Sequence, residues 1–327
     1  MEEKKPSSSK EFIECISVLQ FIATFLFLGP ICVALMVYLM FTSLWILPVL
    51  YLSWQVLDWN TPERGGRRTF FVRNWQVWKH MADYFPFKLV KTAELSPSKN
   101  YIVGCHPHGI MSLGAFACFG TDRCGFPEAF PGVRSCLAVL GGLFKVPLYR
   151  EYVMSAGLYP VSKASIEHLL TKSGQGNAVV IIIGGAEESL FSSPGVNTVV
   201  MKNRKGFVKL ALEYGADLVP VYSFGENDLF RQVVLPDGTV GRRLQALFKK
   251  VVGFAPCLFK GERFLFMPYR TPVTAVVGSP ISVPKVPSPS QEQVDHYHQQ
   301  YMEALTKLFH QHKKSCGLAE SHQICIT

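Results

Sequence analysis

The segment Ala178-Val-Val-Ile-Ile-Ile183, which Gly184-Gly185 ends, is the strongest strand signal in this 327-residue chain. It is short, rich in β-branched residues and apolar throughout, a pattern typical of a central strand in a sheet covered on both faces. Three further segments have the character of buried strands, at 101–105, 217–224 and 273–277. Segments of helical character alternate with them, and this order predicts an α/β fold with parallel strand pairs.

Helix candidates with recognisable start and stop signals fill the intervals between these strands. Ser162 is placed to cap a helix that runs to Leu170. Gly215 can adopt the left-handed conformation that ends a helix, which predicts a helix over 204–214. Ser290 and Gln293 form a capping-box pattern at the start of a C-terminal helix with an apolar stripe. Further helices are expected at 74–80 and 110–119. The predicted architecture is a mixed, partly parallel sheet flanked by helices.

The N-terminal part of the chain is strongly hydrophobic. No Asp, Glu, Lys or Arg occurs from Cys15 to Leu57. That run is too long for one membrane pass, which takes about 20 residues, so we expect a hairpin over 15–58 with its turn near 41–43. The second half is short and contains Pro48, which leaves a re-entrant or tilted segment open. A cleaved signal peptide and a pair of soluble core helices are the alternatives.

The charges around this run predict its orientation. Basic residues stand on both sides of it, namely Lys4, Lys5 and Lys10 before it and Arg64, Arg67, Arg68 and Arg73 after it. Because basic residues favour the cytosolic side, both ends are expected there. The expected organisation is a cytosolic tail over 1–14, a transmembrane or re-entrant hairpin over 15–58, and a cytosol-facing domain over 59–327.

The composition narrows the classes of partner. A net charge of +9 and a pI of about 9.1 favour an anionic partner. Nucleic acid is not expected, because the chain has no zinc-finger spacing, basic heptad helix or RNP-like strand. The basic residues adjoin apolar segments, which favours a lipid bilayer. Nine scattered cysteines without a C-x-x-C pair indicate a reducing environment.

The motif His106-Pro107-His108-Gly109 is the best candidate for a catalytic site. It directly follows the strand at 101–105, and ligands of α/β sheets bind beyond the carboxyl ends of strands. An imidazole there can take a proton from an alcohol, because its pKa lies near working pH. Proline forces His106 into an extended conformation, so His108 is expected to point into the cleft. Two structural histidines in a turn are the alternative.

A second candidate segment is Gly184-Gly185-Ala186-Glu187-Glu188-Ser189. Paired glycines let a ligand approach the backbone, whose N–H groups could hold a developing oxyanion. A carboxylate from Glu187 or Glu188 could orient a catalytic histidine by accepting its second ring N–H. The alternative is a tight turn that opens a solvated acidic helix.

A third candidate is the basic segment at 202–209. Arg204 near a helix start could hold a phosphate, and Lys205 and Lys209 share a helix face. CoA carries three phosphates, although a solvated basic face explains the same pattern. The tail also contains His296, His298, His310 and His312. Their i,i+2 spacing separates neighbours on a helix, so we expect a solvated face and no metal site.

Six strings together resemble the type-2 diacylglycerol acyltransferase family, which includes monoacylglycerol and wax-alcohol acyltransferases. They run in order over nearly the whole chain: Tyr84-Phe85-Pro86, His106-Pro107-His108-Gly109, Pro147 to Gly157, Gly184-Gly185-Ala186-Glu187-Glu188, Arg204-Lys205-Gly206-Phe207-Val208 and Ser223-Phe224-Gly225-Glu226-Asn227-Asp228. The string Phe25-Leu26-Phe27-Leu28 resembles the short neutral-lipid pattern of the family, although an ordinary membrane segment explains it as well.

The resemblance implies a glycerolipid-acyltransferase-like fold and an acyl-CoA-dependent enzyme of the endoplasmic reticulum membrane. Its site would face the cytosol and esterify mono- or diacylglycerol, with acyl-CoA as co-substrate and no cofactor. His106, His108 and Glu188 match the active-site positions of the family. Gly109, Gly184, Gly185, Arg204 and Lys205 then become candidates for binding the oxyanion or acyl-CoA. A homo-oligomer is compatible with the resemblance.

One departure from the family pattern keeps alternatives open. A Gly-rich aromatic stretch expected between Gly261 and Met267 is shortened to 262–266, which bears on the acceptor pocket. A wax-alcohol or retinol acyltransferase, and an inactive lipid-binding or scaffold member, therefore remain alternatives. A lipid hydrolase is a further rival, although the chain has no G-x-S-x-G motif.

Overall fold

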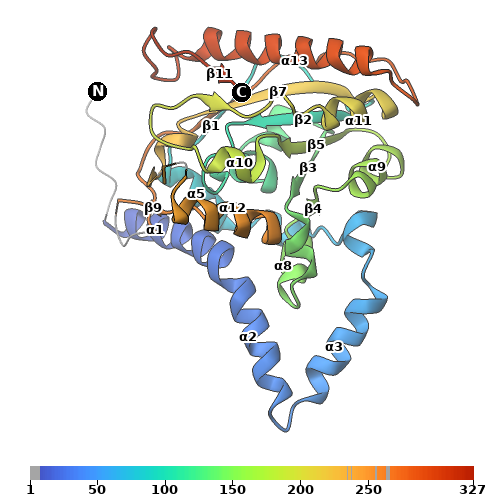
Figure 1. Cartoon of the computed structure of the whole chain (residues 1–327), viewed down its shortest axis with the longest axis vertical. Coiled ribbons are helices and arrows are strands. Elements are labelled where there is room, and N and C mark those ends of the chain that lie inside the picture. The colour runs from blue at the N-terminus through green and yellow to red at the C-terminus, as the bar shows by residue number, and fades with distance from the viewer. Residues whose placement is uncertain (1–7, 234, 237, 255, 263–265) are drawn as a thin grey trace.

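A seven-stranded sheet is the centre of the protein (Figure 1), seen in a computed structural model that describes residues 8–233, 235–236, 238–254, 256–262 and 266–327. The strand order is β1-β10-β7-β2-β5-β3-β4. The strands are β1 Lys88–Lys91, β2 Tyr101–His106, β3 Arg134–Val139, β4 Leu158–Pro160, β5 Asn177–Ile182, β7 Asp217–Phe224 and β10 Thr274–Val277. All neighbours pair in parallel except β10, which is antiparallel to β7. The predicted mixed, partly parallel sheet is therefore confirmed.

The central strands β2, β5 and β7 were predictable because both of their faces are buried. Strands β2 and β7 are buried along their whole lengths, and β5 is buried except at Ile182. Apolar, β-branched side chains fill such positions because helices cover both faces of the sheet. The strands differ from the expected segments by no more than one residue at either end.

Three helices cover one face of the sheet: α9 Lys163–Thr171, α11 Gly206–Tyr214 and α13 Gln291–His312. Ser162 caps α9 through the amide of Ser165, and α13 has both hydrogen bonds of the capping box that its sequence predicts. Its buried side includes Tyr301 and Leu305, which pack on β7 and its neighbours. The expectation of a solvated histidine face is wrong for His298, which is buried with Nε2 3.2 Å from the carbonyl of Met201.

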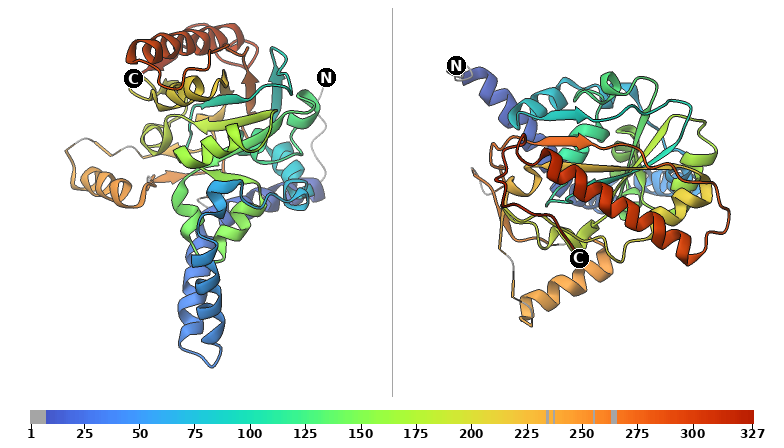
Figure 2. Two further views of the ribbon diagram at one scale, coloured as in Figure 1. Left: turned by 90° about the vertical axis from the view of Figure 1, so that its right-hand side faces the viewer. Right: turned by 90° about the horizontal axis from the view of Figure 1, so that it is seen from above.

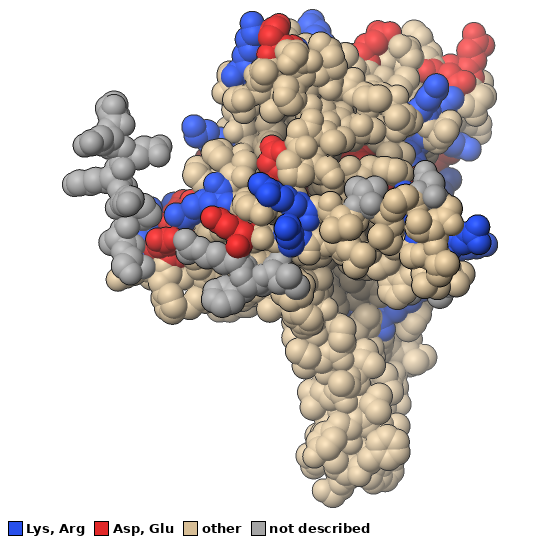
Figure 3. Space-filling view, turned by 60° about the vertical axis from the view of Figure 1, so that its left-hand side comes forward, with Lys and Arg blue, Asp and Glu red and all other residues tan. Residues whose placement is uncertain are grey.

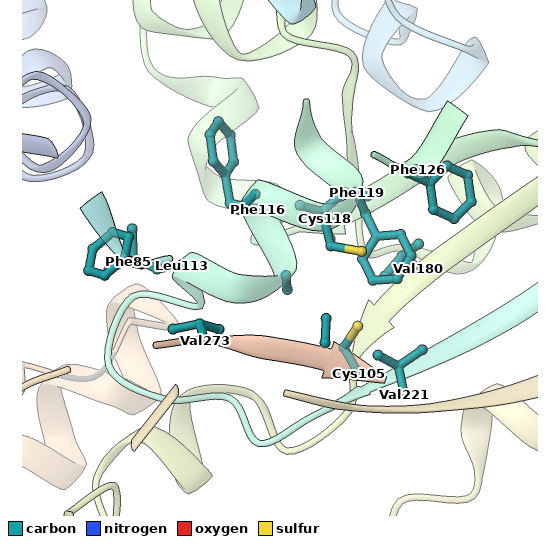
Figure 4. Close-up of a cluster of buried hydrophobic side chains, with 14 of the residues drawn as sticks. Phe85, Cys105, Leu113, Phe116, Cys118, Phe119, Phe126, Val180, Val221 and Val273 are labelled. Carbon is teal, nitrogen blue, oxygen red and sulfur yellow. The ribbon is translucent and has the colours of Figure 1, made fainter. Parts of the chain in front are cut away.

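The opposite face of the sheet is covered by α1 Ser8–Ala23, α5 Gln76–Tyr84 and the segment after the His-Pro-His-Gly turn. Figure 4 shows the resulting core, in which Cys118 and Phe119 lie near Cys105, Val180 and Val221 of the strands, whereas Phe116 points away from the sheet.

The continuous helix expected over 110–119 is replaced by shorter pieces. An irregular stretch reaches Ser112, a single turn forms α6 Leu113–Ala115, and a π-helix η3 follows at Phe116–Gly120. The helix starts late because Ser112 adopts a positive φ of 53° and the carboxylate of Glu226 binds the amides of Leu113 and Gly114.

The hydrophobic N-terminal run forms an arm that projects from the body (Figures 1 and 2). A continuous apolar helix spans Ser9–Met40 and is long enough to cross a membrane by length and composition. It comprises α1, a π-helix η1 Thr24–Leu28 and α2 Gly29–Met40, and a turn leads to α3 Ile46–Leu57. Because Val18 and Ile22 of α1 belong to the body core, the projecting hairpin is shorter than the expected 15–58.

The remaining elements are short connections and edge pairs. They are η2 Thr61–Arg64, α4 Phe70–Arg73, α7 Phe126–Ala129, η4 Gly141–Lys145, α8 Tyr149–Ser155, α10 Gly185–Ser189, β6 Thr198–Val199, η5 Glu226–Asp228, β8 Arg231–Gln232, α12 Val240–Val252, β9 Phe259–Lys260 and β11 Cys325–Ile326. All nine cysteines lie in the described part of the chain and are free thiols.

Candidate active site

Three adjacent parallel strands end at the same edge of the sheet and carry the candidate residues. Strand β2 lies between β5 and β7, and the motifs that contain His108, Glu188 and Glu226 directly follow these three strands. Parallel strands present their carboxyl ends together, so segments about 80 and 40 residues apart in sequence meet here. The fold thus brings together the His-Pro-His-Gly turn and the Gly-Gly turn, as the sequence predicted.

Hydrogen bonds fix the protonation pattern of the His108 ring. Nδ1 lies 3.0 Å from the carbonyl oxygen of Gly109, which can only accept, so Nδ1 carries the proton. The hydroxyl of Ser112 donates to the carbonyl of His108 at 2.8 Å and therefore also faces Nδ1, at 3.3 Å, as an acceptor. Nε2 then holds the lone pair, and no described residue hydrogen-bonds to it. His108 is half-buried, and burial lowers the pKa of its imidazole, which keeps the ring neutral.

His106 occupies a different environment. Its ring is fully buried, and Nε2 lies 3.1 Å from the hydroxyl of Tyr301 on α13. That hydroxyl donates its one proton to the carbonyl of Gly104 at 3.1 Å, so Nε2 of His106 donates to Tyr301. Burial lowers the pKa of His106 to about 3. His106 therefore connects the strand end to the C-terminal helix as a neutral ring.

Glu188 holds the His-Pro-His-Gly turn through the main chain. Its Oε1 accepts from the amide of His108, and its Oε2 accepts from the amide of Val200 at 2.7 Å. The expected contact between this carboxylate and an imidazole ring is not the arrangement found. Gly184 makes room for the carboxylate, because a Cβ there would lie 2.0 Å from Oε2 of Glu188. Burial raises the pKa of Glu188 to about 7.

A second buried carboxylate, Glu226, was not predicted as a site residue. It accepts from the amides of Leu113 at 2.9 Å and Gly114 at 2.7 Å, and burial raises its pKa to about 7. Gly109 has a φ of +63°, and a Cβ there would lie 2.6 Å from the Glu226 side chain. The available signal was an acidic residue two positions after a mostly apolar strand. Glu226 therefore fixes the chain after the turn, at Leu113 and Gly114, whereas Glu188 fixes the turn itself at His108.

The backbone and the basic segment complete the site. The amide of Gly109 has no hydrogen-bond acceptor among the described residues, which leaves it available to an oxyanion. Gly185, with a φ of +58°, opens α10. Arg204 pairs with Glu187 at 2.7 Å, next to Glu188, and Lys205 pairs with Asp295 at 2.7 Å. The side chains of Arg204 and Lys205 are 45% and 37% exposed, and with their carboxylate partners they form a charged edge beside the Gly-Gly turn.

Two apolar cavities adjoin the hydrophobic arm, and the smaller also borders the residues that follow the His-Pro-His-Gly motif. The smaller, of about 250 Å³, is lined by Ile110 and Met111 of the turn and by Phe25 of the arm. The larger, of about 740 Å³, is an open groove along α2 that Phe25 also lines. Phe266 belongs to the smaller cavity, whereas 263–265 of the shortened stretch lie outside the described residues. The site thus has a polar edge at 187–205 and an apolar side toward the arm.

Comparison with known proteins gives consistent matches over most of the chain. A family model described as diacylglycerol acyltransferase matches residues 37–327. Diacylglycerol O-acyltransferase 2 of Xenopus tropicalis is 53% identical over 98% of this chain and 90% of its own length. Human 2-acylglycerol O-acyltransferase 3 is 50% identical over 97% of this chain and 94% of its own length.

Among solved structures, the 1-acyl-sn-glycerophosphate acyltransferase PlsC of Thermotoga maritima matches with a TM-score of 0.40 and 13% identity, covering 91% of this chain and 96% of that one.

Proposed function

The chain belongs to the diacylglycerol acyltransferase family, and from this membership we propose that it transfers a fatty acyl group from acyl-CoA to the hydroxyl of mono- or diacylglycerol. The observation that carries the proposal is the identity of 50% or more, over nearly the full chain, to relatives named as diacylglycerol and 2-acylglycerol O-acyltransferases. The products would be di- and triacylglycerol. The site supports this activity, because a neutral imidazole lies in a turn whose following residues line an apolar cavity, and the basic residues Arg204 and Lys205 follow the neighbouring Gly-Gly turn.

In the proposed mechanism, Nε2 of His108 is the general base. It takes the proton of the glycerol hydroxyl while the hydroxyl oxygen attacks the thioester carbonyl. The amide of Gly109 would stabilise the negative oxygen of the tetrahedral intermediate. The intermediate collapses with cleavage of the carbon–sulfur bond, and the CoA thiolate takes the proton back from the imidazolium. The ester and free CoA are released, and His108 returns to its neutral form.

The proposed substrate positions follow from the two sides of the site. Arg204 and Lys205 would attract the phosphates of CoA at the exposed basic edge. Their present partners, Glu187 and Asp295, are also exposed, and surface ion pairs of this kind contribute only about 0–1 kcal/mol. Phosphates can therefore displace them at small cost. The acyl chain and the acylglycerol would lie on the apolar side, in the cavities that Phe25 lines.

The membrane location is proposed from the arm and its flanks. Ion pairs occur directly after the end of α3, where Asp58 pairs with Arg67 and, at 3.0 Å, with Arg150. The projecting end of the arm carries no charged side chain on the face that Figure 3 shows. We infer insertion into the endoplasmic reticulum membrane from its cytosolic side, with the candidate active site facing the cytosol.

The direct test is product analysis with the full chain in lipid bilayers. Radiolabelled acyl-CoA is supplied without acceptor and then with monoacylglycerol, diacylglycerol, a long-chain alcohol or retinol. We expect labelled di- or triacylglycerol and little free fatty acid. Ester formed only on the alcohol or retinol, free acid alone, or no product on any acceptor from a folded protein would each refute the proposal.

A further inference from the structure

The helix α12 Val240–Val252 has its apolar side turned away from the protein. Val240, Leu244 and Leu247 are 71%, 61% and 58% exposed. The one side chain of this helix described as buried is polar, namely Gln245, which donates to the carbonyl of Pro256 at 3.0 Å. A helix on the surface of a soluble protein has the reverse arrangement, with apolar residues inward. The exposed side therefore needs a partner of its own.

The sequence of α12 indicates that this partner is negatively charged. It contains Arg242, Arg243, Lys249 and Lys250 and no acidic residue. The 3.6-residue period places Arg243 and Lys250 at the edge of the side that carries Leu244 and Leu247. Arg242 lies instead over the ring of Phe191 at 5.0 Å, which ties the helix to the body. A basic rim beside an apolar side favours a surface that is apolar and anionic together.

The position of α12 agrees with such a surface. Figures 1 and 2 show it at the edge of the body, at the height of α1 and close to the end from which the arm projects. It lies across the direction of the arm in Figure 1. Helix α1 also exposes apolar side chains at this height, among them Phe12 at 64% and Ile16 at 48%. A bilayer entered by the arm would meet both helices at its surface.

We propose that α12 lies in the surface of the phospholipid bilayer, with its apolar side among the upper acyl chains and Arg243 and Lys250 at anionic headgroups. Amphipathic helices with basic polar edges bind membranes in this manner. Arginine and lysine extend their charged ends to the headgroups while their stems stay apolar. A second copy of the same helix is the less favoured occupant, since its basic residues would repel those of the first.

This contact goes beyond the proposed activity and reaches the cavity beside the candidate active site. The chain after α12 supplies Phe254, Pro256 and Cys257 to the 250 Å³ cavity, opposite Ile110 and Met111 of the His-Pro-His-Gly turn. Gln245 holds Pro256 directly. Seating α12 in the bilayer therefore also places one wall of that cavity at the membrane surface, where a lipid acceptor can enter.

The test places an environment-sensitive fluorophore on the exposed side of α12. Leu247→Cys is made in a Cys325→Ser background, which removes the exposed native thiol, and the label-treated background protein is the blank. The matched control is Ala246→Cys, since the helical period turns position 246 away from Leu244. The full chain is reconstituted in phosphatidylcholine vesicles with phosphatidylserine, and nitroxide lipids quench whatever lies in the bilayer. We expect quenching at 247 to exceed that at 246 severalfold.

Equal, weak quenching at both positions would overturn the proposal. So would a fluorophore at 247 that is shielded from water yet not quenched by lipid, because a protein would then cover the helix. Arg243→Gln with Lys250→Gln should reduce quenching at 247 in vesicles that contain phosphatidylserine, and an unchanged value would refute the headgroup contact. The experiment measures where the fluorophore lies and does not measure turnover. A failure of the membrane contact is therefore distinguishable from a failure of the proposed activity.

Discussion

At the residue scale, two neighbouring histidines of one motif have opposite protonation patterns. His108 carries its proton on Nδ1, because the carbonyl of Gly109 accepts from it, whereas His106 carries its proton on Nε2 and donates to Tyr301. Only His108 is partly exposed. We therefore propose His108 as the base and give His106 a positioning role. The sequence already favoured His108 for the cleft, whereas the two protonation patterns follow from the structure.

The pH dependence of turnover follows from the burial of His108. Burial lowers the pKa of its imidazole below the ordinary value of 6.5. Since the neutral ring is the base, protonation of the ring removes the base. The acid limb of kcat/KM that belongs to His108 should thus lie below pH 6.5 when measured in bilayers with saturating acyl-CoA. Burial raises the pKa values of Glu188 and Glu226 to about 7, so the profile is compared with those of Glu188→Gln and Glu226→Gln. An acid limb centred above pH 6.5 in all three proteins would contradict this assignment.

Glu226 should matter for both stability and turnover. Glu226→Ala leaves the amides of Leu113 and Gly114 without their acceptor, and each unpaired buried group costs about 1–3 kcal/mol. We expect a lower unfolding temperature in detergent and a reduced kcat, because the His-Pro-His-Gly turn loses its support. The matched control is Glu128→Ala, which removes an exposed carboxylate from α7. Identical unfolding temperatures and kcat values for the two variants would refute the role of Glu226.

At the element scale, the sequence predicted the three central strands and β10 well, missed β1, β3 and β4, and predicted the site turn poorly. Strands 101–105, 178–183 and 217–224 are local patterns of buried, β-branched residues, and the caps at Ser162 and Ser290 depend on neighbours three residues away. The helix expected over 110–119 failed because Glu226, more than 100 residues later, takes its first amides. The role of Glu188 differed for the same reason, since it binds main-chain amides that no local pattern identifies.

The packing of α13 on β2 depends on a strand glycine. A Cβ at Gly104 would lie 2.0 Å from the Tyr301 hydroxyl and 2.6 Å from Ile183. Gly104→Ala should therefore destabilise the fold by about 1–3 kcal/mol, as overpacking of a core does. Thermal unfolding in detergent measures the change, and Gly141→Ala, with open space at its Cβ, is the control. Equal unfolding temperatures would show that the strand–helix contact is looser than described.

At the scale of the whole molecule, the projecting hairpin is shorter than a bilayer. Helices α2 and α3 have 12 residues each, which at about 1.5 Å per residue gives about 18 Å, against a hydrocarbon core of about 30 Å. The first part of α2 also packs on α8 through Cys32. These dimensions favour the re-entrant alternative over two full passes.

A re-entrant hairpin predicts that its turn stays within the bilayer. A cysteine introduced at Ser43 should resist an impermeant maleimide in sealed microsomes, both before and after the lumenal side is opened. Cys325, which is exposed in the body, is the positive control from the cytosolic side. Labelling at position 43 only after the lumen is opened would instead indicate two full membrane passes.

The central claim is that the neutral ring of His108, held beside the Gly-Gly turn, removes the proton of the acceptor hydroxyl. The most direct measurement is the esterification rate of His108→Ala in the same bilayers, with His296→Ala on the exposed side of α13 as the matched control. Removal of a general base typically costs about 10²–10⁴-fold in rate. We predict a loss of this size in kcat with an unchanged unfolding temperature. Esterification by His108→Ala at the rate of the unsubstituted chain would contradict the account.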